Sequence, residues 1–434
     1  MQNAILADIF GAALDAADPV QAVLSVFKVE NGMLLVSGRH YDLDAYSRIV
    51  VIGAGKASSK MAVAIEMLLG SRIDAGLVIV KIGHAEKLLY IEQVEASHPI
   101  PDHSGMMATR RILDMAREAD ERTLILCLLS GGASALLSMP APGLSLEDKQ
   151  AATYRLLNAG ASISETNAVR KHISSIKGGQ LARAAYPAQI ISLVISDVIG
   201  DRIDVIASGP TSKDDSTFLD AFAIAEKYGL PERILEHLRR GIQGEIPETP
   251  KEDMPNVNHV IAASNRQALE AAREKATLLG FDVQIVTDRL QGEARTAARD
   301  LAEKARANLF PGRKLCLISG GETTVTVNGK GKGGRNQEFA LAFCIEIDGE
   351  AGIALLSAGT DGTDGPTDAA GAYVDGSTAH IAKGLGIDPC VYLDHNDSYG
   401  FFSKLEALSG IRCHYKTGPT GTNVMDIQIL LLQA

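Results

Sequence analysis

The sequence predicts an α/β fold of two domains with mainly parallel sheets covered by helices. A chain of 434 residues exceeds the size of one ordinary domain. Apolar runs such as Thr123–Leu129 are continuous rather than alternating, which indicates strands buried on both faces of a sheet. These runs alternate with helical patterns, and the 42 glycines suit many tight turns between strands and helices.

The elements of the first half follow in the order of a βαβ fold. The chain opens with a helical pattern, and Asp18 and Pro19 are placed as the N-cap and first residue of a second helix. Continuous apolar strands are predicted at residues 48–52, 75–80, 123–129 and 189–195. Further helices are predicted over residues 57–69, 105–118, 146–161 and 165–185.

A polar stretch with three prolines, from Gln243 to Asn258, is the best candidate for a linker. It separates an N-terminal Rossmann-like α/β domain, residues 1–245, from a C-terminal α/β domain, residues 246–434. We allow for the last residues packing back on the first domain. The alternation restarts after the linker, with strands at 259–263, 281–287, 314–319 and 353–357 and helices at 265–279 and 293–308.

Composition narrows the class of protein. A net charge of −11 argues against a general nucleic-acid binder, which would usually show a basic face. Five widely spaced cysteines without a CxxC pair indicate neither a zinc site nor a disulfide framework. Three aspartates precede the first basic residue, Lys28, which is the reverse of a signal peptide, and the apolar runs are too short to span a bilayer. We expect a cytoplasmic protein without nucleic-acid or membrane partners.

The segment that indicates function most directly begins where an apolar run ends in Ser319-Gly320-Gly321, followed by Glu322. Residues 329–338 then hold four glycines, two lysines and an arginine. Glycine lets backbone N–H groups approach an anion closely, while Lys332 and Arg335 add charge and Arg335 adds a planar fork that fits phosphate oxygens. The segment therefore predicts binding of a phosphorylated ligand, with Glu322 as a candidate for holding a metal or a substrate hydroxyl.

A second glycine turn, Gly53-Ala54-Gly55-Lys56, joins a strand to a helix and aims backbone N–H groups at an anion. It is not a P-loop, because Val50 stands where that motif needs a glycine, and Ser58 leaves a dinucleotide fingerprint incomplete. The glycines could serve tight turning alone, but a lysine at a helix start opposes the helix dipole and so favours phosphate binding. Ser130-Gly131-Gly132 repeats the turn at Ser319, as either an anion site or a plain strand exit.

Acidic residues after strands supply further candidates. Asp197 follows a predicted strand, a place where open α/β sheets bind ligands. The loop over residues 357–368, with Asp361, is either a turn-rich surface loop or a source of oxygen ligands for Mg²⁺. His98 lies in the rigid segment 97–102, where it can shape a pocket wall or act as a base. No Ser/His/Asp or Cys/His arrangement can be assembled.

Several motifs spread over nearly the whole chain match one family: residues 53–58, 97–102, 130–134, 196–211, 319–323, 331–338, 357–368 and 417–426. In combination they resemble the class II glycerate 2-kinase family, whose C-terminal half is a MOFRL-type domain and some of whose members were formerly labelled hydroxypyruvate reductases. The resemblance implies two α/β domains with the active site in the cleft between them. It also implies transfer of phosphate from ATP to the 2-hydroxyl of D-glycerate, with Mg²⁺.

By this resemblance, Lys56 and Arg335 sit in the family's catalytic motifs, one in each domain, and are expected to neutralise the phosphates. Asp197, Glu322 and Asp361 are candidates for Mg²⁺ or for the glycerate hydroxyls, and Asp197 also for taking the hydroxyl proton. The expected phosphate- or substrate-binding residues are Gly53, Gly55, Ser130, Gly131, Gly132, Ser319, Gly320, Gly321 and Lys332.

Two other functions stay open. An NAD(P)H-dependent hydroxypyruvate reductase would need a complete fingerprint and an acidic residue about twenty positions beyond it, and Asp74 lies at that distance. A non-catalytic sugar-phosphate sensor would use the same turns but would not need Asp197, Glu322 and Asp361. The expected partners are glycerate and a nucleotide, and a homodimer is allowed for without being established.

Overall fold

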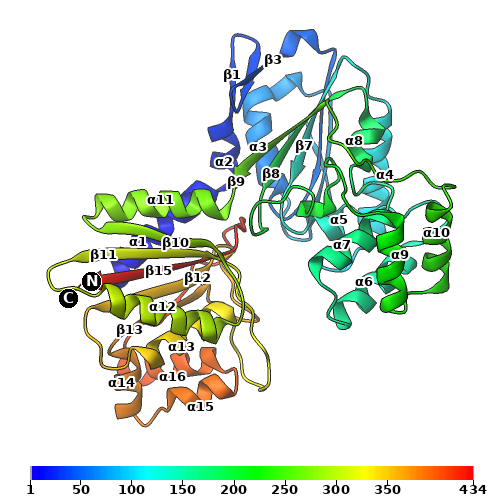
Figure 1. Cartoon of the computed structure of the whole chain (residues 1–434). Helices are drawn as coiled ribbons and strands as arrows, with labels where there is room; N and C mark the ends of the chain where they lie inside the picture. Colours follow the sequence, from blue (N-terminus) through cyan, green and yellow to red (C-terminus); the bar gives the residue numbers. More distant parts are fainter. Residues whose placement is uncertain (1, 434) are drawn as a thin grey trace. The chain divides into compact units, whose positions relative to one another are not determined.

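The computed structural model describes residues 2–433, which form two compact units (Figure 1). The N-terminal unit is Pro19–Ala262, and the C-terminal unit combines the chain up to Asp18 with the chain from Ala263 onward. These bounds differ from the predicted domains 1–245 and 246–434. The difference arises because the first helix belongs with the second half of the chain and the predicted linker leads into a strand of the first sheet.

The N-terminal unit is built on a six-stranded sheet in the order β6-β5-β4-β7-β8-β9. From β6 to β8 each neighbouring pair is parallel, which confirms the expected parallel sheet. The chain moves outward from β4 to β5 and β6, then returns to start β7 on the other side of β4, so the topology reverses between β4 and β7. The strands are β4 (Arg48–Ala54), β5 (Ala75–Lys81), β6 (Glu92–Ala96), β7 (Thr123–Leu129), β8 (Gln189–Ile195) and β9 (Val257–Ala263).

Helices cover both faces of this sheet, as the continuous apolar strands predict. Val50 and Ile52 of β4 share a core with Ile112 of α4, and Figure 1 shows α3 and α4 on opposite faces. The intervening residue, Val51, is also fully buried, so both faces of the strand are removed from water. The covering helices are α3 (Ser58–Leu69), α4 (His103–Arg117), α5 (Ala133–Leu136) and α8 (Gln180–Ala185), with α2 (Pro19–Val26) packed beside α3.

Beside the sheet lies a helical layer with an apolar core of its own. The prediction of a single helix over residues 165–185 is wrong, because the chain forms two helices there, α7 and α8. Between them Gly178 and Gly179 have φ of +57° and +78°, which ends the helical path. A small antiparallel sheet near the start of the unit was not predicted. The elements are α6 (Leu146–Asn158), α7 (Ile163–His172), α9 (Phe218–Lys227) and α10 (Glu232–Ile242), and β1 (Phe27–Glu30), β2 (Met33–Val36) and β3 (Arg39–Asp42).

The C-terminal unit has a six-stranded sheet in the order β10-β11-β15-β12-β13-β14. Only β10 and β11 are parallel, and the other pairs are antiparallel, so the expectation of a mainly parallel sheet is wrong for this unit. Strand β12 is buried at every residue and apolar except for Ser357, because both of its faces are covered, whatever the direction of its neighbours. The strands are β10 (Asp282–Leu290), β11 (Lys314–Gly321), β12 (Ile353–Gly359), β13 (Gly371–Asp375), β14 (His414–Tyr415) and β15 (Asp426–Gln433).

The two ends of the chain meet in this unit. Helix α1 (Gln2–Ala17) packs on α11 and β15, with Phe10 edge-on to Tyr415 at 5.3 Å and the Thr422 hydroxyl donating to the Ala17 carbonyl at 2.6 Å. Strand β15 lies between β11 and β12, so the last described residues complete the sheet of the C-terminal unit. The other helices are α11 (Asn265–Leu278), α12 (Ala294–Asn308), α13 (Arg335–Glu346), α14 (Thr378–Gly384), α15 (Pro389–Asp394) and α16 (Ser398–Ser409).

No single helix within residues 2–433 is long and apolar enough to cross a membrane, although the bent pair of α1 and α2 reaches that length and composition when taken together.

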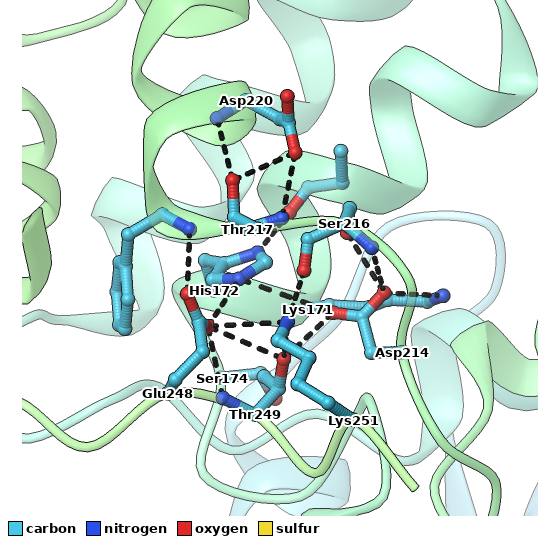
Figure 2. A network of polar contacts seen from close by, with 12 residues as sticks. Lys171, His172, Ser174, Asp214, Ser216, Thr217, Asp220, Glu248, Thr249 and Lys251 are labelled. Carbon is cyan, nitrogen blue, oxygen red and sulfur yellow. Dashed lines mark hydrogen bonds and ion pairs between the residues drawn. The ribbon is translucent and has the colours of Figure 1, made fainter.

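A buried ionic network ties the helical layer to the segment before β9 (Figure 2). The Lys171 ammonium lies 3.0 Å from an Asp214 carboxylate oxygen, and both side chains are almost fully buried. His172 Nε2 lies 2.9 Å from Glu248, and the Thr249 hydroxyl donates to Asp214 at 3.0 Å. Such a network holds its partners firmly because each charge that loses its partner would remain in an apolar surrounding.

We expect Asp214→Asn to lower the free energy of unfolding by about 3 kcal/mol, because it leaves the buried Lys171 ammonium without its nearest counter-charge. Urea titration at pH 7 measures the change. The matched control is Glu232→Gln, which breaks an exposed pair with Arg239 and should cost less than about 1 kcal/mol. Equal effects of the two variants would contradict a special role for the network.

Candidate active site

Two turns meet at the carboxyl ends of β4 and β7, where the sheet topology reverses. The Lys56 amide donates to the Gly131 carbonyl at 2.8 Å, and the Ala57 amide donates to the Ser130 hydroxyl at 3.0 Å. A methyl group on Gly53 would lie 2.2 Å from the Leu128 carbonyl, and one on Gly55 would lie 2.1 Å from the Ser130 hydroxyl. These glycines are therefore required for the two turns to pack together, whether or not they also bind an anion.

Three side chains that the sequence offers as site candidates lie close to Gly131 and Gly132. A methyl group on Gly131 would lie 2.3 Å from an Asp197 carboxylate oxygen. One on Gly132 would lie 3.3 Å from His98 Nε2 and 3.4 Å from Lys56 Cγ. The fold thus brings Lys56, Asp197 and His98, which are far apart in sequence, to one turn at the switch point of the sheet, the usual place for a ligand in such folds.

The surroundings set different protonation behaviour for the two titratable groups. Burial raises the pKa of Asp197 above its usual range, against the opposing charge of Lys56. Burial, followed by the charge of Lys56, lowers the pKa of His98 to about 4. His98 is therefore a neutral imidazole at pH 7 and a poor proton acceptor, whereas a carboxylate with a raised pKa is better matched to general-base work.

The second site lies in the C-terminal unit around Arg335, at the start of α13. Its Nε and one terminal nitrogen contact the Asp426 carboxylate at 2.5 and 2.9 Å, and the other terminal nitrogen lies 2.6 Å from Glu322. Asp364 accepts hydrogen bonds from the Asn336 and Gln337 amides at 3.0 and 2.9 Å, so an internal carboxylate already occupies the N-terminus of this helix. Arg335 is held in a fixed orientation within an acidic surrounding.

The glycine turn before Glu322 has a packing role as well. A methyl group on Gly320 would lie 2.0 Å from the Asn265 side-chain oxygen, and one on Gly321 would lie 2.3 Å from the Leu290 carbonyl. Ser319, the first residue of the turn, is buried. Lys332 is directed at α16, with its ammonium 4.6 Å from the centre of the Tyr399 ring and its amide bonded to Asp397. The phosphate-binding roles of these residues stay predictions.

The candidate metal ligands lie in both units, with Asp197 in the N-terminal one and Glu322 and Asp361 in the C-terminal one. Within residues 2–433 no group of three His, Cys, Asp or Glu side chains could by itself hold a metal ion. Asp361 and Asp426 nevertheless face one glycine, because a methyl group on Gly359 would lie 3.4 and 3.3 Å from one oxygen of each. This donor set fits Mg²⁺, which takes one or two carboxylates together with phosphate oxygens.

Sequence reasoning missed two carboxylates of this site. Asp426, 1% exposed, is the bidentate partner of Arg335, and Asp364 caps α13. Burial raises the pKa of Asp364 to about 6, and the charge of Asp426 adds to the effect. Asp426 ends the matched motif 417–426, so its position was noticed, but its partner lies 91 residues away and only the fold reveals it.

These features define an α/β enzyme of two units whose candidate site residues gather at glycine turns. The family described as a domain of unknown function, DUF4147, matches residues 5–243, and the MOFRL family matches residues 315–426. The chain belongs to the glycerate 2-kinase family that is built from these two domains.

Relatives cover nearly the whole chain. The D-glycerate 2-kinase of Thermotoga maritima is 46% identical to this chain, over 89% of this chain and 91% of its own length. A crystal structure of glycerate kinase from Thermotoga maritima matches this structure with a TM-score of 0.87 and 41% identity, covering 100% of both chains. The glycerate 2-kinase of Pyrococcus horikoshii is 43% identical over 97% of this chain and 95% of its own. An Agrobacterium vitis protein, 42% identical over 89% and 99%, is named provisionally as a hydroxypyruvate reductase.

The electrostatic link between Lys56 and His98 can be measured. We expect Lys56→Met to raise the pKa of His98 from about 4, because one of the cations that oppose its protonation is removed while its burial is kept. NMR titration of protein labelled with ¹³C-histidine follows the ring directly. Lys87→Met, which removes an exposed lysine, is the control, and an unchanged His98 titration in Lys56→Met would refute the arrangement.

Proposed function

We propose that the protein transfers the γ-phosphoryl group of ATP to the 2-hydroxyl of D-glycerate, giving ADP and 2-phosphoglycerate. The observation that carries the proposal is the convergence of Lys56 and Asp197 on the Gly131–Gly132 turn at the switch point between β4 and β7. The names and the extensive similarity of the Thermotoga and Pyrococcus relatives support the choice of reaction. The predicted cleft between two domains stays a prediction.

Asp197 is suited to accept the proton of the attacking hydroxyl. It lies near Lys56, and burial raises its pKa, which makes its carboxylate more basic than an exposed one. Lys56 can then neutralise charge on the transferring phosphoryl group, which is the main task of a protein in this chemistry. His98 remains neutral and can only offer a hydrogen bond at this turn.

Arg335 plays a different part from the free phosphate clamp that its sequence context predicts. Each of its three side-chain nitrogens already contacts a carboxylate of Asp426 or Glu322. Two further carboxylates lie nearby. The charge of Asp364 helps to raise the pKa of Arg335, and the charge of Asp361 helps to raise the pKa of Asp426. A single arginine among four carboxylates favours a divalent cation with its phosphates over a bare phosphate.

Asp361, which faces Gly359 together with Asp426, is the side chain that we propose to hold Mg²⁺ in this unit. Asp426 orients Arg335, and Glu322, which contacts the same arginine, is the second candidate ligand. When bound, the ion supplies neutralisation of the phosphate charge. The protein's own contribution is to keep the arginine and the carboxylates in fixed positions, since Asp426 is fully enclosed and bonded through both oxygens.

The reductase alternative is disfavoured by the position of Asp74. Its carboxylate accepts a hydrogen bond from the Ile49 amide at 2.7 Å, at the start of β4, and Asp74 itself directly precedes β5. In a parallel sheet this is the edge opposite the carboxyl ends where Gly53–Lys56 lies, so Asp74 cannot bind the ribose of a dinucleotide at that turn. A non-catalytic sensor needs no general base, so the sensor alternative does not account for the raised pKa of Asp197.

A direct assay tests the proposal. Purified protein with D-glycerate, ATP and Mg²⁺ should form ADP and 2-phosphoglycerate. A coupled assay measures the ADP, and NMR identifies the phosphorylated product. Consumption of NADH with hydroxypyruvate, without ADP formation, would establish the reductase instead. Absence of both reactions, with glycerate and nucleotide still bound, would favour the sensor.

Changing either cationic side chain should slow turnover. We expect Lys56→Met and Arg335→Lys each to lower kcat by about 10²–10³. The first removes a charge proposed to act on the transferring phosphoryl group, and the second removes the planar fork that contacts Asp426 and Glu322 together. Initial rates at saturating substrates measure kcat, and circular dichroism checks the fold. Lys87→Met is the matched control for a lysine outside the site, and a normal kcat in either site variant would remove that residue from catalysis.

The role of Asp197 as a base predicts a pH dependence. A base must be unprotonated, so kcat/KM should fall as the pH is lowered through the pKa of Asp197, which burial places above the usual aspartate range. Asp197→Asn should lower kcat by about 10²–10⁴ and remove this acidic limb. A variant that is slow but keeps the same limb would show that another group takes the proton.

A further inference from the structure

The N-terminal unit contains three cationic side chains that have no internal counter-charge. Lys149 lies on α6, Arg170 on α7, and Lys177 in the segment that separates α7 from α8. Lys149 is 4% exposed and Lys177 is 1% exposed, while Arg170 is partly buried. Among the ion pairs formed within residues 2–433, none involves any of these three.

The donors of this cluster are also poorly satisfied. Lys149 Nζ is buried and has no hydrogen-bond partner within the described part of the chain, and the same holds for the side-chain nitrogen of Asn167 on α7. Lys177 Nζ reaches only the Ala207 carbonyl, at 3.3 Å. Buried donors are normally paired, so unpaired donors of this kind point to an acceptor that the chain itself does not provide.

These groups lie together in the fold. Asn167 and Arg170 are three residues apart on α7 and so share a face of the helix. Lys177 bonds to Ala207, and Asn167 accepts a hydrogen bond from the next residue, Ser208, at 3.0 Å. Burial and the charge of Arg170 lower the pKa of Lys149 to about 7, and burial with the charges of Lys149 and Arg170 lowers that of Lys177 well below its ordinary value.

Lys171, next to Arg170 on the same helix, shows how this unit treats a purely structural cation. Its side chain is 6% exposed, and its ammonium is neutralised by Asp214 at 3.0 Å (Figure 2). Asp204 lies 3.9 Å from the same ammonium. Burial of a charge without a partner is costly, and the cost is met in Lys171 by an internal carboxylate. The neighbouring cluster lacks one, although the same layer of helices surrounds it.

The cluster is connected to the candidate active site within the same unit. The Ser208 hydroxyl that bonds to Asn167 also lies 3.2 Å from the Ser134 hydroxyl, two residues beyond Gly132. Ala207 and Ser208 have φ of +55° and +59°, a backbone region that non-glycine residues avoid. Such strain is found where a segment must present groups to a ligand, here between the cations and the turn that carries Lys56 and Asp197.

We propose that Lys149, Arg170, Lys177 and the amide of Asn167 form an oxyanion pocket that takes the carboxylate of the acid substrate. Lys149 and Lys177 are almost fully buried, which suits the small carboxylate group at the end of a small molecule better than the phosphates of a nucleotide. Its position beside the Ser130–Ser134 turn places the rest of a small hydroxy acid toward Asp197. This inference rests on the proposed function for the identity of the acid, but not for the anion chemistry.

Asn167→Asp is the sharpest test, because it puts a carboxylate into the pocket with almost no change of shape and keeps the oxygen that accepts from Ser208. The internal anion should satisfy the cations and compete with the substrate. We expect the KM for D-glycerate to rise about 10- to 100-fold, the loss of one or two charge-assisted hydrogen bonds, while the KM for ATP is unchanged. Asn158→Asp, an equal charge change at an exposed position of α6, is the control.

A second measurement does not depend on turnover. Thermal denaturation of the wild type should be shifted upward by D-glycerate and by acetate, and this shift should be lost in Asn167→Asp and in Lys177→Met. If the kinase assay fails while these shifts are seen, the pocket stands and the reaction is wrong. An unchanged KM for glycerate in Asn167→Asp, or a shift produced by inorganic phosphate but not by the carboxylates, would overturn the proposal.

Discussion

The rest of the N-terminal site depends on the close contact between the turns that follow β4 and β7. Two hydrogen bonds, from the Lys56 amide to Gly131 and from the Ala57 amide to Ser130, hold the turns together, and glycine at positions 53 and 55 is what lets the backbones approach. Because β4 and β7 are parallel neighbours across the point where the topology reverses, their turns open on the same edge of the sheet. Asp197 follows the end of β8, the next strand along, so its carboxylate and the stem of the Lys56 side chain both lie against glycines that have no side chain of their own.

The two units carry opposite imbalances of charge. Besides Lys56, the N-terminal unit holds three basic side chains without a counter-charge, Lys149, Arg170 and Lys177, of which the two lysines are buried, and this suits a small acid. The C-terminal unit gathers carboxylates around one arginine, which suits a divalent cation with its phosphates. The overall charge of −11 conceals both features, because each is local and lies among residues that are far apart in the sequence. Their complementarity supports a division of labour in which one unit recognises the acid and the other recognises the metal-bound nucleotide.

Most elements could be predicted because their signal is local. Strands such as β7 and helices such as α11 follow from a continuous apolar run or a helical period, and both have the expected positions to within one residue. The direction of strands in the second sheet could not be predicted, since continuous apolarity reports burial on both faces and β12 has that pattern while pairing antiparallel. The break between α7 and α8 was also missed, because it depends on where Gly178 and Gly179 pack against distant residues such as Ser212.

By itself the sequence determined the α/β class, the glycine turns, the motifs that identify the family, and the residue types that can carry charge. Tertiary structure decided which of these residues lie together. Asp426 became the partner of Arg335 across 91 residues, Asp74 was placed at the wrong edge of the sheet for a dinucleotide, and Lys149, Arg170 and Lys177 proved to lack counter-charges that Lys171 possesses. The physical reason is that the pKa of a charged group and the energetic cost of burying it depend on its surroundings. Its burial, its distance to an opposite charge and the hydrogen bonds of its donors are set by chain segments that only the fold brings together.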